Sequence, residues 1–231
     1  MLYLFDIDGT LLLTGGAGRR ALNALFSTRY GVDDAMATVR VAGNTDRLII
    51  TGIFESKLEA SPTEDEIDEL LAAYVPMLRH ELVNSPGFRT MPSAGEVLDY
   101  LADDAGVTLA IASGNVRPAA WAKLERAGFR HHFETGGFGC DHAVRAHLVE
   151  RAIERGLALA ASPIDRRDIV VVGDTTHDVS AARACGVRVL AVATGGIPRA
   201  DLEAAGPDAV FDSLAELPAW HRAQLPGGQV Q

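Results

Sequence analysis

Five short apolar runs, well separated along the chain, dominate its pattern of hydrophobic and polar positions. They cover residues 2–5, 107–112, 169–172, 187–192 and 209–211. These runs are apolar at nearly every position rather than at alternate ones, which is typical of strands buried on both faces of a parallel sheet. We therefore expect five strands in one parallel sheet.

Amphipathic stretches bounded by helix-starting and helix-ending residues lie between these runs. The segment Ser93-Ala94-Gly95-Glu96 has the spacing of a capping box, a second helix runs from Pro118 to Gly128, and a third follows Asp174 and stops at Gly186. Alternating strands and helices are joined by right-handed crossovers. The pattern predicts an α/β fold, a doubly wound parallel sheet with helices on both faces.

Residues 15–87 break this alternation, because the pattern there is helical throughout. Apolar positions recur with helical spacing over 19–30 and 46–57, and Ser61-Pro62-Thr63-Glu64 opens a third helix. We expect this segment to be a small α-helical cap domain inserted after the first strand.

The insertion divides the rest of the chain. The α/β core domain is then discontinuous and comprises residues 1–14 and 88–231. Glycine and proline at 15–18 and 85–87 are suited to hinges, since the glycines lack the spacing of a phosphate-binding P-loop. Residues 224–231 are expected to form a flexible tail.

Composition narrows the possible partners. The 231 residues carry a formal net charge of −10, and no run of Lys or Arg offsets it. This argues against nucleic acid or an anionic membrane surface as a partner, and an anionic substrate would need a locally positive site. Cys140 and Cys185 lack a Cys-x-x-Cys spacing, as expected of free thiols in a reducing cytoplasm. No signal peptide or membrane-span pattern is apparent, so we expect a cytoplasmic protein.

Two carboxylates, Asp6 and Asp8, follow the first apolar run and directly precede Gly9. A strand that continued to Asp8 would carry both side chains on the same side, since side chains alternate along a strand. Two like charges so close repel each other, and a cation or a shared proton must compensate. A hard divalent cation with oxygen ligands, Mg²⁺ above all, satisfies this arrangement.

Polar residues also follow the next two long apolar runs. Ser113-Gly114-Asn115 comes after one, and Gly173-Asp174-Thr175-Thr176-His177-Asp178 comes after the other. In an open parallel sheet, ligands bind at the carboxyl ends of the strands. A hydroxyl with backbone N–H groups suits an anion, and further carboxylates suit the same cation. We expect the three polar strand ends to form one site.

With these motifs the chain resembles the haloacid dehalogenase superfamily of aspartyl-nucleophile hydrolases, in its phosphoglycolate phosphatase-like branch with a helical cap after the first strand. The resemblance covers nearly the whole chain. It is specific at Asp6-Ile7-Asp8-Gly9-Thr10 and at residues 173–178, and it depends on a single hydroxyl at Ser113. It implies that Asp6 accepts the phosphoryl group, and that Asp8 protonates the leaving oxygen and then activates water.

The resemblance also implies the ligands of the site. Mg²⁺ would be held by Asp6, the backbone carbonyl of Asp8 and Asp174, with Asp178 in or beside that shell. Phosphoryl oxygens would be bound by the following side chain and backbone groups: Ser113, Gly114 and Asn115.

The catalytic lysine departs from the commonest family pattern. Many relatives carry Lys-Pro before the helix that precedes the Gly-Asp loop, whereas residues 139–145 contain no lysine. Lys123 is similar to the alternative placement in some members, so we expect it to bind phosphate and act in catalysis. Arg145 is the substitute candidate, and it would offer a fork of donors rather than a point charge.

A polar turn at residues 43–47 opens the second helix of the expected cap. Thr45 or Asp46 can simply cap that helix. Alternatively the turn reaches over the site, in which case Asn44, Thr45 and Arg47 contribute to substrate specificity.

The constellation predicts a Mg²⁺-dependent phosphomonoester hydrolase that acts on a small phosphorylated metabolite, such as phosphoglycolate or a sugar phosphate, through an aspartyl-phosphate intermediate. A related phosphomutase, similar to β-phosphoglucomutase, would use the same two acids but return the phosphoryl group to a sugar. A dehalogenase is disfavoured because those relatives lack the second acid, here Asp8. A catalytically idle module that binds Mg²⁺ and phosphate is a third reading, against which the intact Asp6, Asp8 and Asp174 argue.

Overall fold

The structure, a computed structural model, describes residues 1–39, 41 and 43–225. The strands are β1 (Leu2–Phe5), β2 (Leu12–Thr14), β3 (Phe88–Thr90), β4 (Thr108–Ser113), β5 (Gly136–Phe138), β6 (Ile169–Gly173), β7 (Arg188–Val192) and β8 (Ala209–Phe211). The α-helices are α1 (Ala17–Tyr30), α2 (Asp46–Ile53), α3 (Glu64–Val83), α4 (Ala94–Ala102), α5 (Arg117–Ala127), α6 (Arg145–Leu159), α7 (Thr176–Ala184), α8 (Arg199–Ala204) and α9 (Leu217–Gln224). Within this part of the chain, no helix has both the length and the apolar character needed to cross a bilayer.

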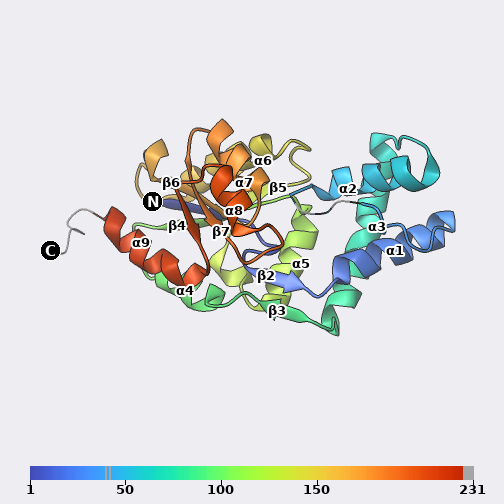
Figure 1. Ribbon diagram of the computed structural model, residues 1–231, viewed down its shortest axis with the longest axis horizontal. Helices are drawn as coiled ribbons and strands as arrows, with labels where there is room; N and C mark the ends of the chain where they lie inside the picture. Colours follow the sequence, from blue (N-terminus) through green and yellow to red (C-terminus); the bar gives the residue numbers. More distant parts are fainter. Residues whose placement is uncertain (40, 42, 226–231) are drawn as a thin grey trace.

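Six of the strands form one parallel sheet in the order β5-β4-β1-β6-β7-β8 (Figure 1). Strand β1 is central and the chain builds outwards from it in both directions, which confirms the predicted doubly wound sheet. The sequence pattern missed β5, because two of its three residues are glycines. One of them, Gly137, has no room for a side chain: a Cβ atom would lie 1.8 Å from the carbonyl oxygen of Leu148 in α6.

Alternate residues of β1 pack against the two faces of the sheet. Tyr3 and Phe5 belong to a buried cluster with residues of α4, α5 and α9. Leu2 and Leu4 belong to a second cluster with residues of α6, α7 and α8. Burial on both faces explains why the strand is apolar at every position.

Helices α1, α2 and α3 lie together at one end of the molecule, away from the C-terminal helix α9 (Figure 1). They share a third apolar cluster, which includes Val116, Ala119 and Ala122 at the start of α5. Helix α2 continues into one wider π-helical turn, Phe54–Leu58. The three helices are therefore packed directly onto one helix of the sheet layer.

The two connections into this helical group lie side by side. A Cβ atom on Gly15 would lie 2.2 Å from the carbonyl oxygen of Pro86, and the Ser85 hydroxyl donates to the carbonyl of Thr14 over 2.5 Å. The antiparallel strands β2 and β3 pair directly on the core side of these two connections. This geometry supports the predicted cap at 15–87, and the domain boundaries stay a prediction. Most of the predicted tail, residues 226–231, lies outside the described residues.

The predicted capping box at Ser93 was wrong in its detail. Thr63 caps α3 by a capping box with Glu66. Helix α4 begins where Ser93 indicated, but the Ser93 backbone is left-handed, with φ at 61°, and its side chain makes no capping hydrogen bond. A capping side chain requires an extended backbone at its own residue, which the turn before α4 does not provide.

Candidate active site

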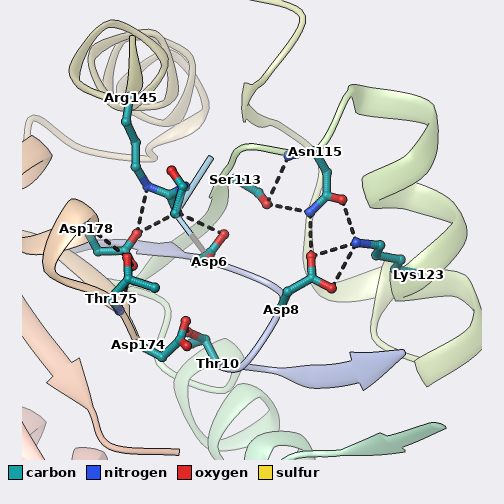
Figure 2. A network of polar contacts seen from close by, with 11 residues as sticks. Asp6, Asp8, Thr10, Ser113, Asn115, Lys123, Arg145, Asp174, Thr175 and Asp178 are labelled. Atoms are coloured by element: carbon teal, nitrogen blue, oxygen red, sulfur yellow. Dashed lines mark hydrogen bonds and ion pairs between the residues drawn. The ribbon is translucent and has the colours of Figure 1, made fainter. Parts of the chain in front are cut away.

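The first strand ends at Phe5, so Asp6 and Asp8 lie in the loop that follows it. Their side chains do not share one side, as a longer strand would have required. Asp6 faces Arg145 at the start of α6, whereas Asp8 faces Lys123 of α5 (Figure 2). The two acids are therefore held in different surroundings.

Asp8 is bound by an amide and an ammonium group. Lys123 Nζ lies 2.6 Å from Oδ2 and 2.9 Å from Oδ1 of Asp8, and it also donates to Asn115 Oδ1 over 2.6 Å. The Asn115 Nδ2 group donates to Asp8 Oδ2 over 2.7 Å. The Lys123 side chain is only 7% exposed, while that of Asp8 is 41% exposed. Asp8 is thus fixed in orientation yet open to the cavity.

Ser113 at the end of β4 contacts the same amide. Asn115 Nδ2 donates to Ser113 Oγ over 2.9 Å. Because this oxygen accepts a hydrogen bond, its own O–H proton is available to another acceptor. Ser113, Asn115 and Lys123 are all buried, and the structure brings these predicted phosphate-binding residues together next to Asp8.

Arg145 provides the positive charge opposite Asp6. Its Nη2 lies 3.2 Å from Asp6 Oδ1 and 2.6 Å from Asp178 Oδ1, and its Nε lies 2.9 Å from the same Asp178 oxygen. The other Asp178 oxygen accepts from the backbone and hydroxyl of Thr175, which starts α7. Burial alone would lower the pKa of Arg145, but these carboxylates raise it, so the guanidinium stays charged. The site therefore contains both candidate cations, one paired with Asp6 and the other with Asp8.

The carboxylate of Asp6 lies close to two others, those of Asp174 and Asp178. One oxygen each from Asp6, Asp174 and Asp178 lie within 4.8 Å of one another, and all three residues are buried. Burial, the largest cause, raises the pKa of Asp6 to about 6, and burial with the charges of Asp6 and Asp178 raises that of Asp174 to about 8. Oxygen-only donors that repel one another in this way fit a hard divalent cation. The side chain of Asp8 lies outside this group, in keeping with the expected contribution of its backbone carbonyl alone.

Glycines on two loops enclose the Asp174 carboxylate. A Cβ atom on Gly195 would lie 1.7 Å from Asp174 Oδ2, and one on Gly9 would lie 2.3 Å from the same oxygen. Thr194 beside Gly195 donates to the Gly9 carbonyl over 2.7 Å, which ties the two loops together. Residues 194–196 follow β7, and sequence reasoning missed them although they too stand at the carboxyl end of a strand.

A cavity of about 580 Å³ joins these residues to the helical cap. Its core side includes Asp6, Asp8, Ser113, Lys123, Arg145 and Asp174. Its cap side includes Arg19, Leu22, Met36, Asn44, Ile49 and Tyr74. The walls therefore change from charged groups at the strand ends to mainly apolar groups under the cap.

The structure separates the three predicted specificity residues. Asn44 lines the cavity. Thr45 does not: its hydroxyl accepts the N–H of Leu48 over 3.3 Å and caps α2. Arg47 is also absent from the cavity walls, because its guanidinium is paired with Glu64 and Asp68 of α3. A direct role for Thr45 and Arg47 in substrate contact is therefore not retained.

The polar turn of the cap is docked on the loop that carries Ser113. The Asp46 carboxylate accepts the N–H of Val116 over 2.7 Å, and the Asp46 N–H donates to the carbonyl of Gly114 over 2.9 Å. Gly114 permits this approach, since a Cβ atom there would lie 2.4 Å from the carbonyl of Asn44. Asp46, considered in the sequence only as a helix cap, thus connects cap and core.

Comparison with known proteins agrees with this geometry. A sequence model of the family described as haloacid dehalogenase-like hydrolase matches residues 3–192. The probable phosphatase IndB of Dickeya dadantii is 31% identical over 220 residues, which cover 94% of this chain and 91% of that protein. The phosphoglycolate phosphatase of Mesorhizobium japonicum is 28% identical over 216 residues, 91% of each chain. The chain therefore belongs to the haloacid dehalogenase-like hydrolases, in the phosphoglycolate phosphatase-like branch that its motifs indicated.

Solved structures agree on the fold. CbbY of Rhodobacter sphaeroides, determined in complex with phosphate, aligns with a TM-score of 0.71 at 23% identity, over 94% of this chain and 95% of that one. A likeness at this identity establishes the shared architecture of sheet and helices.

Proposed function

We propose that this hydrolase is a Mg²⁺-dependent phosphatase that releases phosphate from a small phosphorylated metabolite through a phosphoryl group carried on Asp6. One observation carries the proposal: two acids only two residues apart differ in their burial and in their charged partners. Asp6 is buried among Arg145 and two further carboxylates, whereas Asp8 is held by Lys123 and opens to the cavity. Two acids in such different surroundings suit two different tasks.

The group of Asp6, Asp174 and Asp178 suits a divalent cation by its chemistry, and these residues with the Asp8 backbone carbonyl would hold it. When bound, Mg²⁺ would neutralise charge between the attacking carboxylate and the phosphoryl oxygens. The raised pKa of Asp174 supports this assignment, because the cluster is short of positive charge despite Arg145. Asp178 already accepts from Arg145 and Thr175, so its part in the shell is a supporting one.

In the first step, a carboxylate oxygen of Asp6 bonds to phosphorus while the bond from phosphorus to the ester oxygen breaks. Asp8 gives a proton to that leaving oxygen. In the second step, Asp8 takes a proton from water, the water oxygen bonds to phosphorus, and phosphate leaves with Asp6 regenerated. Dividing one displacement between two easier ones is the advantage of covalent catalysis, and the partly exposed Asp8 can exchange its proton with solvent.

Lys123 and Ser113 would hold the transferred group. The Ser113 hydroxyl has a proton to donate, and Lys123 lines the same cavity. When phosphoryl oxygens approach Lys123, it would gain a second anionic partner, so the same ammonium group would contact both Asp8 and the substrate. The unpaired thiols of Cys140 and Cys185 support a reducing compartment such as the cytoplasm.

Phosphate release from a broad panel of phosphorylated metabolites, with and without Mg²⁺, tests the proposal. We expect turnover by the natural sequence with Mg²⁺, and none above background for Asp6→Asn with an unchanged circular dichroism spectrum. Asp65→Asn, an exposed substitution in the first turn of α3, is the matched control and should retain full activity. Activity that survives in Asp6→Asn would rule out the nucleophile.

The same panel separates the rival functions. Isomerisation of a hexose phosphate without phosphate release would indicate a phosphomutase. Failure of every ester to react with Mg²⁺ present would indicate a binding module.

A further inference from the structure

Tyr74 of α3 is a buried side chain whose hydroxyl is unused by the protein. The residue is 2% exposed and lines the cavity between cap and core. Its hydroxyl forms no hydrogen bond with any residue that the structure describes. The oxygen is open to the cavity rather than sealed in the core, because among the described residues Arg188 Nε is the fully buried side-chain polar atom that lacks a partner. A polar group kept in such a place on a cavity wall indicates a partner that enters with the ligand.

The cap wall around this hydroxyl is mainly apolar, and its other polar members are Arg19 and Asn44. Leu22, Met36 and Ile49 are each buried and line the same part of the cavity. Gly18 of α1 leaves space directly at the hydroxyl, since a Cβ atom there would lie 3.1 Å from Tyr74 Oη. The tyrosine is therefore one of a few polar groups in a mainly apolar wall with room beside it, the usual composition of a site that orients an organic ligand.

The charges near Tyr74 define which ligand group can meet it. Burial first, and then the negative charges of Asp46 and Asp8, raise the pKa of Tyr74 well above its ordinary value. The hydroxyl therefore stays protonated and offers its proton to an acceptor. The same two carboxylates disfavour a second anion at this point. A neutral oxygen, such as a hydroxyl or a carbonyl, meets both conditions.

We propose that Tyr74 is a specificity-determining residue that donates a hydrogen bond to a neutral oxygen in the organic part of the substrate, and that this part is larger than a two-carbon acid. The inference rests on the proposed function and specifies its substrate class. The cavity of about 580 Å³ lies within the range of about 300–1,000 Å³ that accepts drug-sized ligands. A two-carbon acid would leave the apolar compartment and the tyrosine hydroxyl without contacts.

Binding to an inactive protein tests this subsite without turnover. Titration calorimetry with Mg²⁺ would compare Asp6→Asn with the double variant Asp6→Asn, Tyr74→Phe, using ribose 5-phosphate, phenyl phosphate and phosphoglycolate. We expect the loss of one hydrogen bond to lower the affinity for ribose 5-phosphate about three- to tenfold. The affinity for phenyl phosphate should not change. The unfolding midpoint should not fall in Tyr74→Phe, because the protein loses no internal hydrogen bond. Tyr30→Phe, in α1 and outside the cavity, is the matched control and should change no affinity.

A second variant, Gly18→Ala, changes the space beside the same hydroxyl. Gly18→Ala favours helix α1 through its higher helix propensity, so the fold should be kept, while the added methyl group crowds Tyr74 Oη. We expect it to weaken ribose 5-phosphate at least as much as Tyr74→Phe does.

Several results would overturn the inference. They are no binding of ribose 5-phosphate, an equal loss for ribose 5-phosphate and phenyl phosphate, or a loss greatest for phosphoglycolate. If the natural sequence releases phosphate but Tyr74→Phe changes the affinity for no ligand, the subsite is overturned and the proposed phosphatase activity is not. Absence of release from every ester would instead overturn the phosphatase, while the binding data would still decide the subsite.

Discussion

Lys123 Nζ lies within 3 Å of both carboxylate oxygens of Asp8, at 2.6 and 2.9 Å, although the two residues are 115 positions apart in the sequence. The lysine reaches the strand end from within α5, one turn and a half beyond the helix start. This contact gives Asp8 a fixed partner, while Asp6 is paired with Arg145. The two candidate cations therefore have different partners: Lys123 contacts Asp8, and Arg145 contacts Asp6.

Replacing Lys123 by methionine should impair catalysis more than folding. Methionine retains the apolar stem but loses the charge that orients Asp8 and that, in the proposed function, would attract the phosphoryl group. We expect kcat/KM for the best substrate of the panel to fall about 100-fold or more, the range typical of a displaced general acid–base group. Steady-state phosphate release measures it. Lys57→Met, at the other lysine of the chain, should stay within twofold, and an equally active Lys123→Met would contradict the assignment.

Arg145 should contribute mainly to stability and to the balance of charge. Arg145→Met leaves three buried carboxylates without their cation, and breaking a buried ion pair in this way costs roughly 3–5 kcal/mol. We expect the free energy of unfolding in urea to fall by that amount without Mg²⁺, and by less with Mg²⁺ present. Arg151→Met, in the same helix and paired with Glu154 at the surface, should change it by less than about 1 kcal/mol. If Arg145→Met lowered the free energy of unfolding equally with and without Mg²⁺, this would contradict the idea that Arg145 and Mg²⁺ neutralise the same carboxylates.

Gly195 should be required for the position of Asp174. An added Cβ atom would lie 1.7 Å from Asp174 Oδ2, so the carboxylate of Gly195→Ala must move. Displacing a group that orients a metal ligand typically costs 10–100-fold in metal affinity. We expect the Mg²⁺ concentration for half-maximal phosphate release to rise by that factor. Gly196→Ala provides the control, because a Cβ atom there has no atom within 4 Å, and a similar effect of both substitutions would argue against the glycine enclosure.

The sheet and its strand ends could be predicted because both leave local signals. Strands buried on two faces are apolar at every position, and the rule that ligands bind at their carboxyl ends brought Asp6, Ser113 and Asp174 into one place. The direction of each acid could not be predicted in this way. It depends on the strand stopping at Phe5 rather than at Asp8, a difference of three residues that lies within the usual uncertainty of element boundaries.

The cap residues could not be assigned from the sequence for a different reason. Arg47 and Asp46 are neighbours on one helix, yet Arg47 pairs with acids of α3 while Asp46 binds the backbone of the core. Helical spacing places the two on different faces but does not say which face meets the site. Tyr74 likewise fits an apolar helix pattern, and only the packing of α3 against α1 and α5 shows that its hydroxyl is left over.

Asp46 should give the protein a pH-dependent stability of defined sign. Burial, the largest cause, raises its pKa from 3.8 to about 6, against the opposing effects of Lys123 and of the Val116 N–H. Between pH 4 and 6 the folded protein keeps a proton that the unfolded chain has lost. The contribution of this group to the free energy of unfolding therefore falls as the pH rises through that range, and it is constant above it.

Asp46→Asn isolates that contribution. Asparagine keeps an oxygen that can accept the Val116 N–H, but it cannot ionise. We expect the variant to gain stability relative to the natural sequence as the pH rises from 4 to 6, by about 2–3 kcal/mol at most. Urea unfolding at closely spaced pH values gives this difference, in which the titration of all other acids cancels. Asp201→Asn, at an exposed residue of α8, is the matched control. If the difference for Asp46→Asn did not change with pH, the Asp46 carboxylate would not be buried between cap and core.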